Sequence, residues 1–140
     1  MGNGIAHVFA QFGHQVNLID VKQASLEKGV ATIVKNLDRQ IKKELITEDD
    51  KKEILGRITT GSDMKIMVSD RELVVEAATE NLDLKLKIFK DLDNSTSDSC
   101  ILASNTSSIS ITKIASVTSK ADKVIGMHFM NPVPVMKLVE

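Results

Sequence analysis

Residues 1–20 read MGNGIAHVFAQFGHQVNLID, and this stretch decides the fold class. A glycine-rich start leads directly into a helical pattern whose apolar face holds Ile5, Val8, Phe9 and Phe12. Gly13 is the expected end of that helix, because glycine readily adopts the left-handed conformation found there. The short apolar run Val16–Ile19 then predicts a strand that closes on Asp20.

The alternation of helix and strand continues along the chain. The expected elements are helices over 25–45 and 48–56, a strand over 73–77, a helix over 81–92, a strand over 101–103, a helix over 110–117 and a strand over 124–127. Thr47 and Ser110 precede two of the helices as N-caps. Strands alternating with helices predict an α/β fold with a mainly parallel, doubly wound sheet, as in Rossmann-like domains.

Several polar residues follow the predicted strands. Sheets of this type bind ligands beyond the C-terminal ends of their strands. The residues found just after a strand are Asp20, Glu80, Asn105 and His128. We therefore expect these side chains to lie together at one edge of the sheet.

The composition excludes several classes of protein. The chain is 42% hydrophobic and 26% charged, with 18 basic and 19 acidic residues, which argues against a nucleic-acid binder. No apolar run reaches the about 18 residues of a membrane span, and we expect no membrane partner. A single cysteine is typical of a reducing compartment and predicts a cytoplasmic protein. No pattern of metal ligands is evident, so we expect no metal.

The start of the chain carries a cofactor signal. Small residues around Gly2 would let a helix N-terminus approach a pyrophosphate closely. Asp20 lies 18 positions after Gly2, about where the dinucleotide fold places an acid that binds a ribose 2′-hydroxyl. Taken alone, the glycines would also fit an ordinary loop. Asp20 alone would also fit a solvent-exposed strand end. Their common register in an α/β chain favours a dinucleotide site.

Residues 127–140 read MHFMNPVPVMKLVE. A histidine ends an apolar run, a Pro-x-Pro turn follows, and a second apolar run ends on a glutamate. A titratable base at a strand end, with a carboxylate brought back by a turn, predicts an acid–base pair of His128 and Glu140. By spacing alone, a core histidine bonded to a backbone carbonyl is the competing interpretation.

Four stretches make the chain resemble a known family. They are MGNGIAHVFAQF at 1–12, VVEAATENL at 74–82, ASNTSS at 103–108 and GMHFMNPVPVMKLVE at 126–140. Together they closely resemble the NAD-binding domain of the short-chain 3-hydroxyacyl-CoA dehydrogenases, especially the bacterial 3-hydroxybutyryl-CoA type. The resemblance extends over the whole chain, and the last two motifs are long and specific.

The resemblance implies a reaction and its catalytic residues. It implies an oxidoreductase that transfers a hydride between NAD and C3 of a short 3-hydroxyacyl-CoA, in fatty-acid or butanoate metabolism. His128 matches the family's acid–base, and Glu140 matches the carboxylate that pairs with it. Ser107 matches the residue that hydrogen-bonds the 3-oxygen of the substrate, although an ordinary turn after a strand is the blander interpretation of this serine.

The resemblance also implies binding residues and partners. The residues matched to the cofactor are Gly2, Asp20, Glu80, Lys85 and Asn105. A helix pair at about 25–57 matches an insertion that contributes to binding of the acyl-CoA. We further expect that the first strand of the sheet and the front of the glycine loop precede residue 1. A helical domain that makes the intact protein a homodimer is expected after residue 140.

Other interpretations stay open at this level. The chain also fits the equivalent domain of a multifunctional β-oxidation protein, or a non-catalytic dinucleotide-binding protein on the same scaffold. His7 and His14 show no functional pattern, since His7 lies off the apolar face of its helix and His14 lies in the turn after Gly13. Cys100 is expected to be a small core residue.

Overall fold

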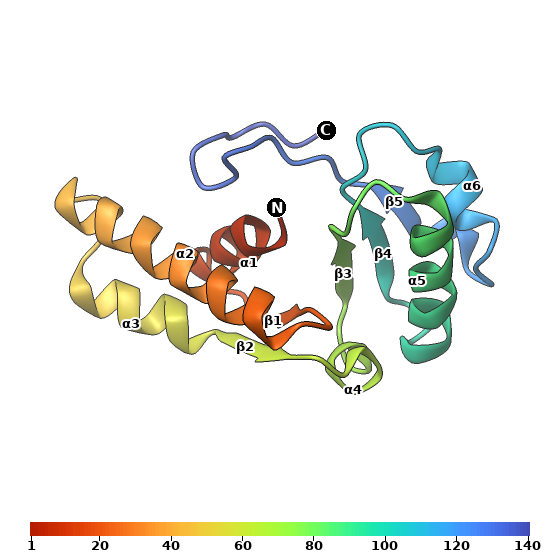
Figure 1. The fold of residues 1–140 in the computed structure, drawn as a ribbon, viewed down its shortest axis with the longest axis horizontal. Helices are drawn as coiled ribbons and strands as arrows, with labels where there is room; N and C mark the ends of the chain where they lie inside the picture. The colour runs from red at the N-terminus through yellow and green to blue at the C-terminus, as the bar shows by residue number, and fades with distance from the viewer. The chain divides into compact units, whose positions relative to one another are not determined.

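The computed structural model describes residues 1–140, which divide into two compact units. Unit 1 comprises residues 1–62 and 131–137, and unit 2 comprises residues 63–130 and 138–140. Each unit combines helices with parallel strands (Figure 1). The chain therefore has the mixed α/β, Rossmann-like architecture that the alternating pattern predicts.

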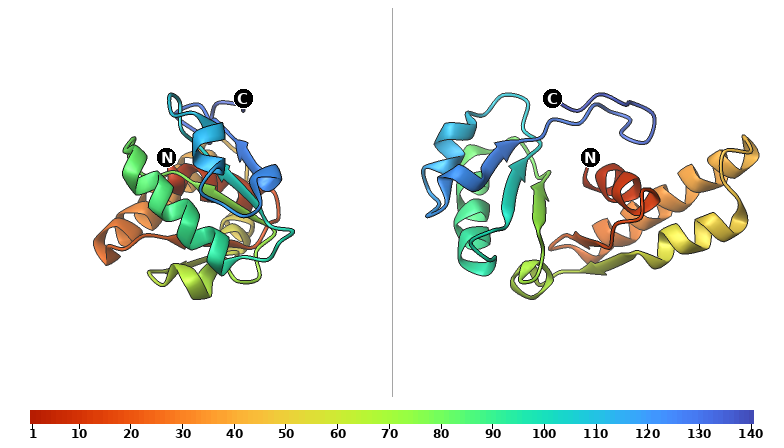
Figure 2. Two further views of the ribbon diagram at one scale, coloured as in Figure 1. Left: turned by 90° about the vertical axis from the view of Figure 1, so that its right-hand side faces the viewer. Right: turned by 180° about the vertical axis from the view of Figure 1, so that it is seen from behind.

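Unit 1 is built around two parallel strands. Its elements are α1 (Gly2–Gln11), β1 (Val16–Ile19), α2 (Gln23–Lys42), α3 (Glu48–Gly56) and β2 (Ile58–Gly61). β1 pairs with β2 in parallel, with Val16 opposite Ile58. Helices α2 and α3 run side by side in opposite directions, as Figures 1 and 2 show. These two helices lie within the range of about 25–57, and that they form an insertion which binds the acyl-CoA stays a prediction.

Local sequence explains how these helices begin and end. Gly13 has a φ of 94°, the left-handed conformation that terminates α1. Thr47 caps α3 in a capping box: its hydroxyl accepts the Asp50 N–H at 3.1 Å, and the Asp50 carboxylate accepts the Thr47 N–H at 2.8 Å. The core of unit 1 lies between α1, α2 and α3 and contains Ala10, Ile33, Leu37 and Ile54.

Unit 2 is built around three parallel strands. Its elements are α4 (Met64–Val68), β3 (Leu73–Glu76), α5 (Leu82–Ser95), β4 (Ile101–Ser104), α6 (Ile111–Ala115), a 3₁₀ turn (Ala121–Lys123) and β5 (Val124–Gly126). The strand order is β3-β4-β5. Helices α5 and α6 lie side by side next to this sheet (Figure 1). The buried apolar residues include Val68, Phe89, Leu92, Cys100, Leu102 and Ile114.

Some expectations were wrong. The pattern missed β2, whose sequence ITTG offers only one apolar residue, and the five-residue α4. The parallel strands expected from the alternation are present as two ladders, β1-β2 and β3-β4-β5. The apolar face of α1 was also misjudged: Phe12 is 76% exposed, whereas His7 is fully buried.

Candidate functional site

The pair formed by His128 and Glu140 closes a short hairpin. The His128 N–H donates to the Glu140 carbonyl at 2.8 Å, and the Glu140 N–H donates to the His128 carbonyl at 3.0 Å. Phe129 and Val139 continue this contact as an antiparallel bridge. The turn between them is closed by the Pro132 carbonyl, which accepts the N–H of Val135 and Met136. The two segments are therefore aligned by backbone hydrogen bonds.

The side chains of this pair also meet. His128 Nδ1 lies 3.2 Å from Glu140 Oε2, and the side chains are 32% and 61% exposed. A carboxylate can only accept, so Nδ1 carries the ring proton and Nε2 keeps its lone pair in the neutral imidazole. The predicted contact is present, and it leaves Nε2 as the nitrogen that can take a proton.

The loop after β4 contacts the chain at the residue next to His128. Asn105 Oδ1 accepts the backbone N–H of Phe129 at 2.8 Å, so Asn105 holds the residue next to His128. The Asn105 amide NH₂ remains as a donor. Ser107 is exposed, and its hydroxyl takes no part in the hydrogen bonds that hold the loop.

Glu80, in the connection between β3 and α5, holds the same loop by hydrogen bonds. Its Oε2 accepts the hydroxyls of Thr106 at 2.7 Å and Ser108 at 2.9 Å. The Thr106 hydroxyl, then the Ser108 hydroxyl and the nearby Lys85, hold the pKa of the Glu80 carboxyl below its usual value. Glu80 is therefore a stable anion fixed against the loop.

The polar residues that follow the strands were expected to lie together, and those in unit 2 do. Glu80 contacts the loop that carries Asn105, and Asn105 contacts the chain at Phe129 next to His128. Asp20 lies in unit 1, so the prediction is tested for the other three residues only.

Lys85 and Glu76 form a buried pair that the sequence pattern did not reveal. Lys85 Nζ lies 2.7 Å from Glu76 Oε1, and both side chains are almost fully buried. Glu76 was counted within an apolar strand, and the expected place of Lys85 on the cofactor side stays a prediction. A signal was available: Glu76 interrupts the apolar run of β3, and Lys85 lies on the inward face of α5 beside Phe89.

The start of α1 in unit 1 offers donors to an anion. The Gly4 and Ile5 N–H groups bond to the Met1 carbonyl, whereas the preceding N–H groups, of Gly2 and Asn3, have no partner inside the helix. No side chain caps this end, and its first turn holds no acidic residue. A helix N-terminus of this kind suits the pyrophosphate of a dinucleotide.

Asp20 follows β1 in the same unit. Its Oδ1 accepts the Lys22 N–H at 2.9 Å, which fixes the carboxylate at the end of the strand. Its second oxygen, Oδ2, takes no part in this turn and is available to a ligand hydroxyl. The residues of unit 1 thus fit a pyrophosphate and a ribose, the two groups that a dinucleotide presents to this part of the fold.

The chain shows neither a metal centre nor a membrane-spanning helix. No group of three or more His, Cys, Asp or Glu side chains is placed to hold a metal ion. None of the helices combines the length and the apolar character that crossing a bilayer requires.

Known proteins are similar to this chain in sequence and in architecture. Residues 1–140 match the family described as 3-hydroxyacyl-CoA dehydrogenase, NAD binding domain. The 3-hydroxybutyryl-CoA dehydrogenase of Bradyrhizobium diazoefficiens is 47% identical over 140 residues, which are 100% of this chain and 47% of that protein. The mitochondrial hydroxyacyl-coenzyme A dehydrogenase of Rattus norvegicus is 44% identical over 146 residues, covering 100% of this chain and 46% of that protein.

A solved structure agrees closely with the fold. The crystal structure of (S)-3-hydroxybutyryl-CoA dehydrogenase from Ralstonia eutropha has a TM-score of 0.96 and 54% identity, and the match covers 99% of this chain and 49% of that chain. The chain thus spans about half the length of the relatives that it matches. Because the family match extends over all 140 residues, the chain belongs to the family of NAD-binding domains of the 3-hydroxyacyl-CoA dehydrogenases.

Proposed function

We propose that the intact protein is an NAD-dependent oxidoreductase that interconverts a short-chain 3-hydroxyacyl-CoA and its 3-keto form, with 3-hydroxybutyryl-CoA and acetoacetyl-CoA as substrates. The observation that carries the proposal is the His128–Glu140 pair, which leaves Nε2 of the imidazole as a base. The named relatives, which are dehydrogenases of such thioesters, support the choice of substrate.

The cofactor contacts are proposed residue by residue. The N-terminus of α1 at Gly2 would hold the pyrophosphate, and Asp20 would bind the adenine ribose. Glu80 and Asn105 would face the nicotinamide half. When bound, NAD would supply the acceptor for the hydride that leaves C3 of the substrate.

The proton of the 3-hydroxyl is transferred to a side chain of the protein, not to NAD. In the oxidation, Nε2 of His128 takes the proton of the 3-hydroxyl, and the ring becomes an imidazolium. Glu140 stabilises that cation and fixes which ring nitrogen faces the substrate. Ser107 donates its hydroxyl hydrogen to the 3-oxygen and stabilises the charge that develops there. In the reduction, His128 returns the proton to the same oxygen.

The CoA site, the assembly and the location of the intact enzyme are proposed with it. Helices α2 and α3 would contribute to binding of the CoA portion, with exposed lysines such as Lys35 and Lys42 available to its phosphates. We also propose that residues 1–140 act as the cofactor domain of a homodimer. The buried, free thiol of Cys100 is compatible with a reducing cytoplasm, which we propose as the location.

A direct assay tests the proposal. The intact protein is mixed with NADH and acetoacetyl-CoA, and the loss of NADH absorbance is followed. We expect turnover that depends on both reactants and that falls at least about a hundredfold in His128→Gln. The matched control is His14→Gln, an exposed histidine of unit 1, which should keep wild-type turnover. A wild-type protein that binds NADH but leaves acetoacetyl-CoA unchanged would refute the assignment.

A further inference from the structure

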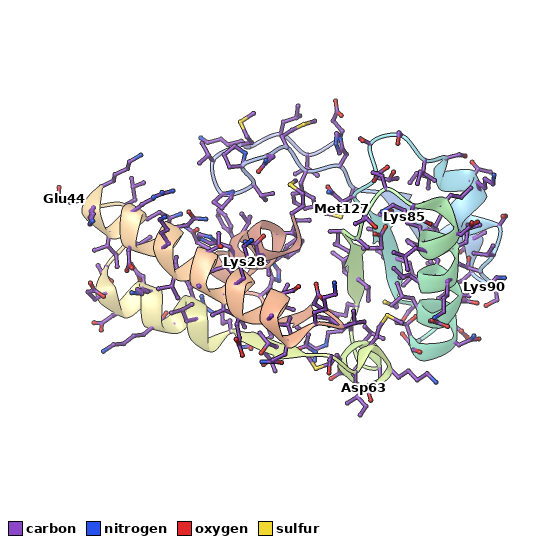
Figure 3. The ribbon with its side chains drawn as sticks, in the orientation of Figure 1. Lys28, Glu44, Asp63, Lys85, Lys90 and Met127 are labelled. Atoms are coloured by element: carbon purple, nitrogen blue, oxygen red, sulfur yellow. The ribbon has the colours of Figure 1, made fainter.

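His128 continues the line of β5 beyond the last residue of that strand, Gly126. Met127, which is labelled in Figure 3, connects the two and donates its N–H to the Ser104 carbonyl of β4 at 2.9 Å. The N–H of His128 is directed to the other side, where the Glu140 carbonyl accepts it at 2.8 Å. Hydrogen bonds that alternate between two sides are typical of a strand, so the chain stays extended at the proposed base.

The neighbouring strand β4 ends too early to bind the next N–H of this stretch. The register places Ser104 opposite Gly126. In a continued parallel ladder, Thr106 would stand opposite His128, and its carbonyl would accept the Phe129 N–H. β4 ends at Ser104, however, and Thr106 has turned into the loop, where its N–H donates to the Ser104 hydroxyl at 3.3 Å. The Phe129 N–H therefore needs an acceptor that the strand does not supply.

Asn105 supplies this acceptor with its side chain. Its Oδ1 accepts the Phe129 N–H at 2.8 Å. A backbone N–H can only donate, so the atom that faces it is the amide oxygen and not the NH₂ group. The N–H of Asn105 itself donates to the Glu76 carbonyl at 2.8 Å, which ties its backbone to β3. The amide oxygen thus replaces the missing strand carbonyl and comes from a residue that is fixed to the sheet.

The bonds to β4 and to Asn105 tie His128 to the sheet of unit 2. Glu140 holds His128 from the opposite side, but residues 138–140 belong to none of the strands. The bonds on the β4 side are those of Met127 and Phe129, one on each side of His128. The bond of Phe129 depends on a side chain, so a single substitution can remove it without altering the main chain.

We propose that Asn105 is a positioning residue for proton transfer by His128 and acts through the Phe129 N–H. The inference rests on the proposed function, because it concerns the base of that reaction. It assigns the amide oxygen of Asn105 to the protein and leaves the NH₂ group for the nicotinamide half. Nε2 of His128 must lie within hydrogen-bond reach of the 3-hydroxyl, and a displacement of about 1 Å at a catalytic group can cost about a hundredfold in rate.

Two replacements of Asn105 separate its oxygen from its NH₂ group. Asn105→Leu removes both, whereas Asn105→Asp keeps an oxygen that can accept the Phe129 N–H. The two variants of the intact protein are compared in kcat with acetoacetyl-CoA and in Kd for NADH, whose reduced ring carries no charge. Each kcat is measured at the pH optimum of the variant, so that an effect of the new carboxylate on the protonation of the base is not counted.

The oxygen should matter for turnover and not for cofactor binding. We expect Asn105→Leu to lose about tenfold or more in kcat, and Asn105→Asp to recover most of that loss. The Kd for NADH should differ less than about threefold between the two variants, since both lack the NH₂ group. The matched controls are Asn94→Leu and Asn94→Asp, at an exposed asparagine of α5, and both should keep the wild-type kcat and Kd.

The inference fails on any of three results. Wild-type kcat in a folded Asn105→Leu protein would show that the bond to Phe129 does not matter for the reaction. Equal losses of kcat in Asn105→Leu and Asn105→Asp would show that the oxygen is not the important group. A difference in the Kd for NADH at equal kcat would make the oxygen a cofactor contact. If leucine prevents folding, Asn105→Ala replaces Asn105→Leu in each comparison.

Hydrogen exchange separates this inference from the proposed function. If the wild-type protein does not turn over acetoacetyl-CoA, the proposed function fails, yet the amide of Phe129 still reports on its bond to Asn105. We expect the protection of this amide to fall in Asn105→Leu and to be retained in Asn105→Asp and in both Asn94 variants. Unchanged protection in Asn105→Leu would overturn the positioning role whatever the activity.

Discussion

His128 and Glu140 are joined twice, by a pair of backbone hydrogen bonds of 2.8 and 3.0 Å and by a side-chain contact of 3.2 Å. The backbone pairing fixes the register of the two segments, so the carboxylate faces the ring without depending on the side-chain contact alone. The imidazole Nδ1 is thereby engaged, and Nε2 is left for proton transfer.

Replacement of His128, the proposed base, should remove turnover and leave cofactor binding intact. We expect His128→Gln in the intact protein to lower kcat by about 10²–10⁴-fold, the usual contribution of general acid–base catalysis, with NADH affinity nearly unchanged. Steady-state kinetics and a titration with NADH provide both numbers. If His128→Gln kept more than about a tenth of the wild-type kcat, the base would have to be another residue.

Replacement of Glu140 should destabilise the protonated form of the His128 ring. Glu140→Gln preserves the shape and the backbone pairing but removes the charge that we propose stabilises the imidazolium. We expect a smaller loss of kcat than in His128→Gln, and little further loss when the two changes are combined, because they remove one function. The same assay provides the comparison, and losses that multiply would show that Glu140 acts independently of His128.

The part of the site that the sequence predicts best is local. His128 and Glu140 lie in one short segment with two prolines between them, and the turn brings the ends of that segment together. The N-caps Thr47 and Ser110 were also predicted correctly, since each cap depends on residues three positions apart.

What the sequence did not predict depends on contacts between distant residues. Glu76 and Lys85 are buried together only because β3 and α5 pack against one another, and each residue alone is typical of a surface. β2 is a strand because it pairs with β1, and its own sequence has weak strand character. His7 is buried because α1 packs with its alanines and His7 inward, a packing that the larger apolar residues of the helix do not suggest.

Asp20 should decide the choice between the two nicotinamide cofactors. Its carboxylate would bind a free 2′-hydroxyl and repel a 2′-phosphate. We expect kcat/KM to be higher with NADH than with NADPH, and Asp20→Ala to reduce this preference by weakening the reaction with NADH. Kinetics with both cofactors check the result, and equal values in the wild-type protein would contradict the role of Asp20.

His7 should make the protein less stable in acid. Its side chain is fully buried, its Nε2 is 3.1 Å from Gln11 Oε1, and its Nδ1 has no hydrogen-bond partner. Burial lowers the pKa of the imidazole from its ordinary 6.5, and the Gln11 hydrogen bond opposes this only in part. The unfolded chain therefore gains a proton near pH 6.5 that the folded chain does not yet bind.

The direction in which stability changes with pH follows from this difference in proton binding. Stability from the neutral His7 is fully present above about pH 6.5 and is lost as the pH falls toward the lowered pKa of the folded state. In His7→Leu, the free energy of unfolding should fall less between about pH 8 and pH 5 than in the wild type. Urea titrations at the two pH values measure this, with the exposed His14→Gln as the control. Equal falls in His7→Leu and the wild type would contradict the prediction.

Gly4 should be intolerant of even a methyl group. A Cβ at this position would lie 3.0 Å from Val133 Cβ and 3.2 Å from its Cγ2, and Val133 is 5% exposed. Alanine favours a helix over glycine by about 0.5–1 kcal/mol, but overpacking costs about 1–3 kcal/mol. Because Val133 Cβ is fixed to the backbone, the segment 131–137 must shift. We expect Gly4→Ala to lower the free energy of unfolding by about 1–2 kcal/mol net.

Gly56→Ala is the matched control for this change. Gly56 also lies in a helix, but a Cβ added there would meet no atom within 4 Å, so alanine should be neutral or stabilise by about 0.5 kcal/mol. Urea unfolding of the two variants gives the comparison. The segment 131–137 lies between His128 and Glu140 in the chain, so its shift in Gly4→Ala should also lower kcat, whereas Gly56→Ala should keep it. A Gly4→Ala protein as stable and active as Gly56→Ala would show that the segment yields to the methyl group without consequence for the pair that it connects.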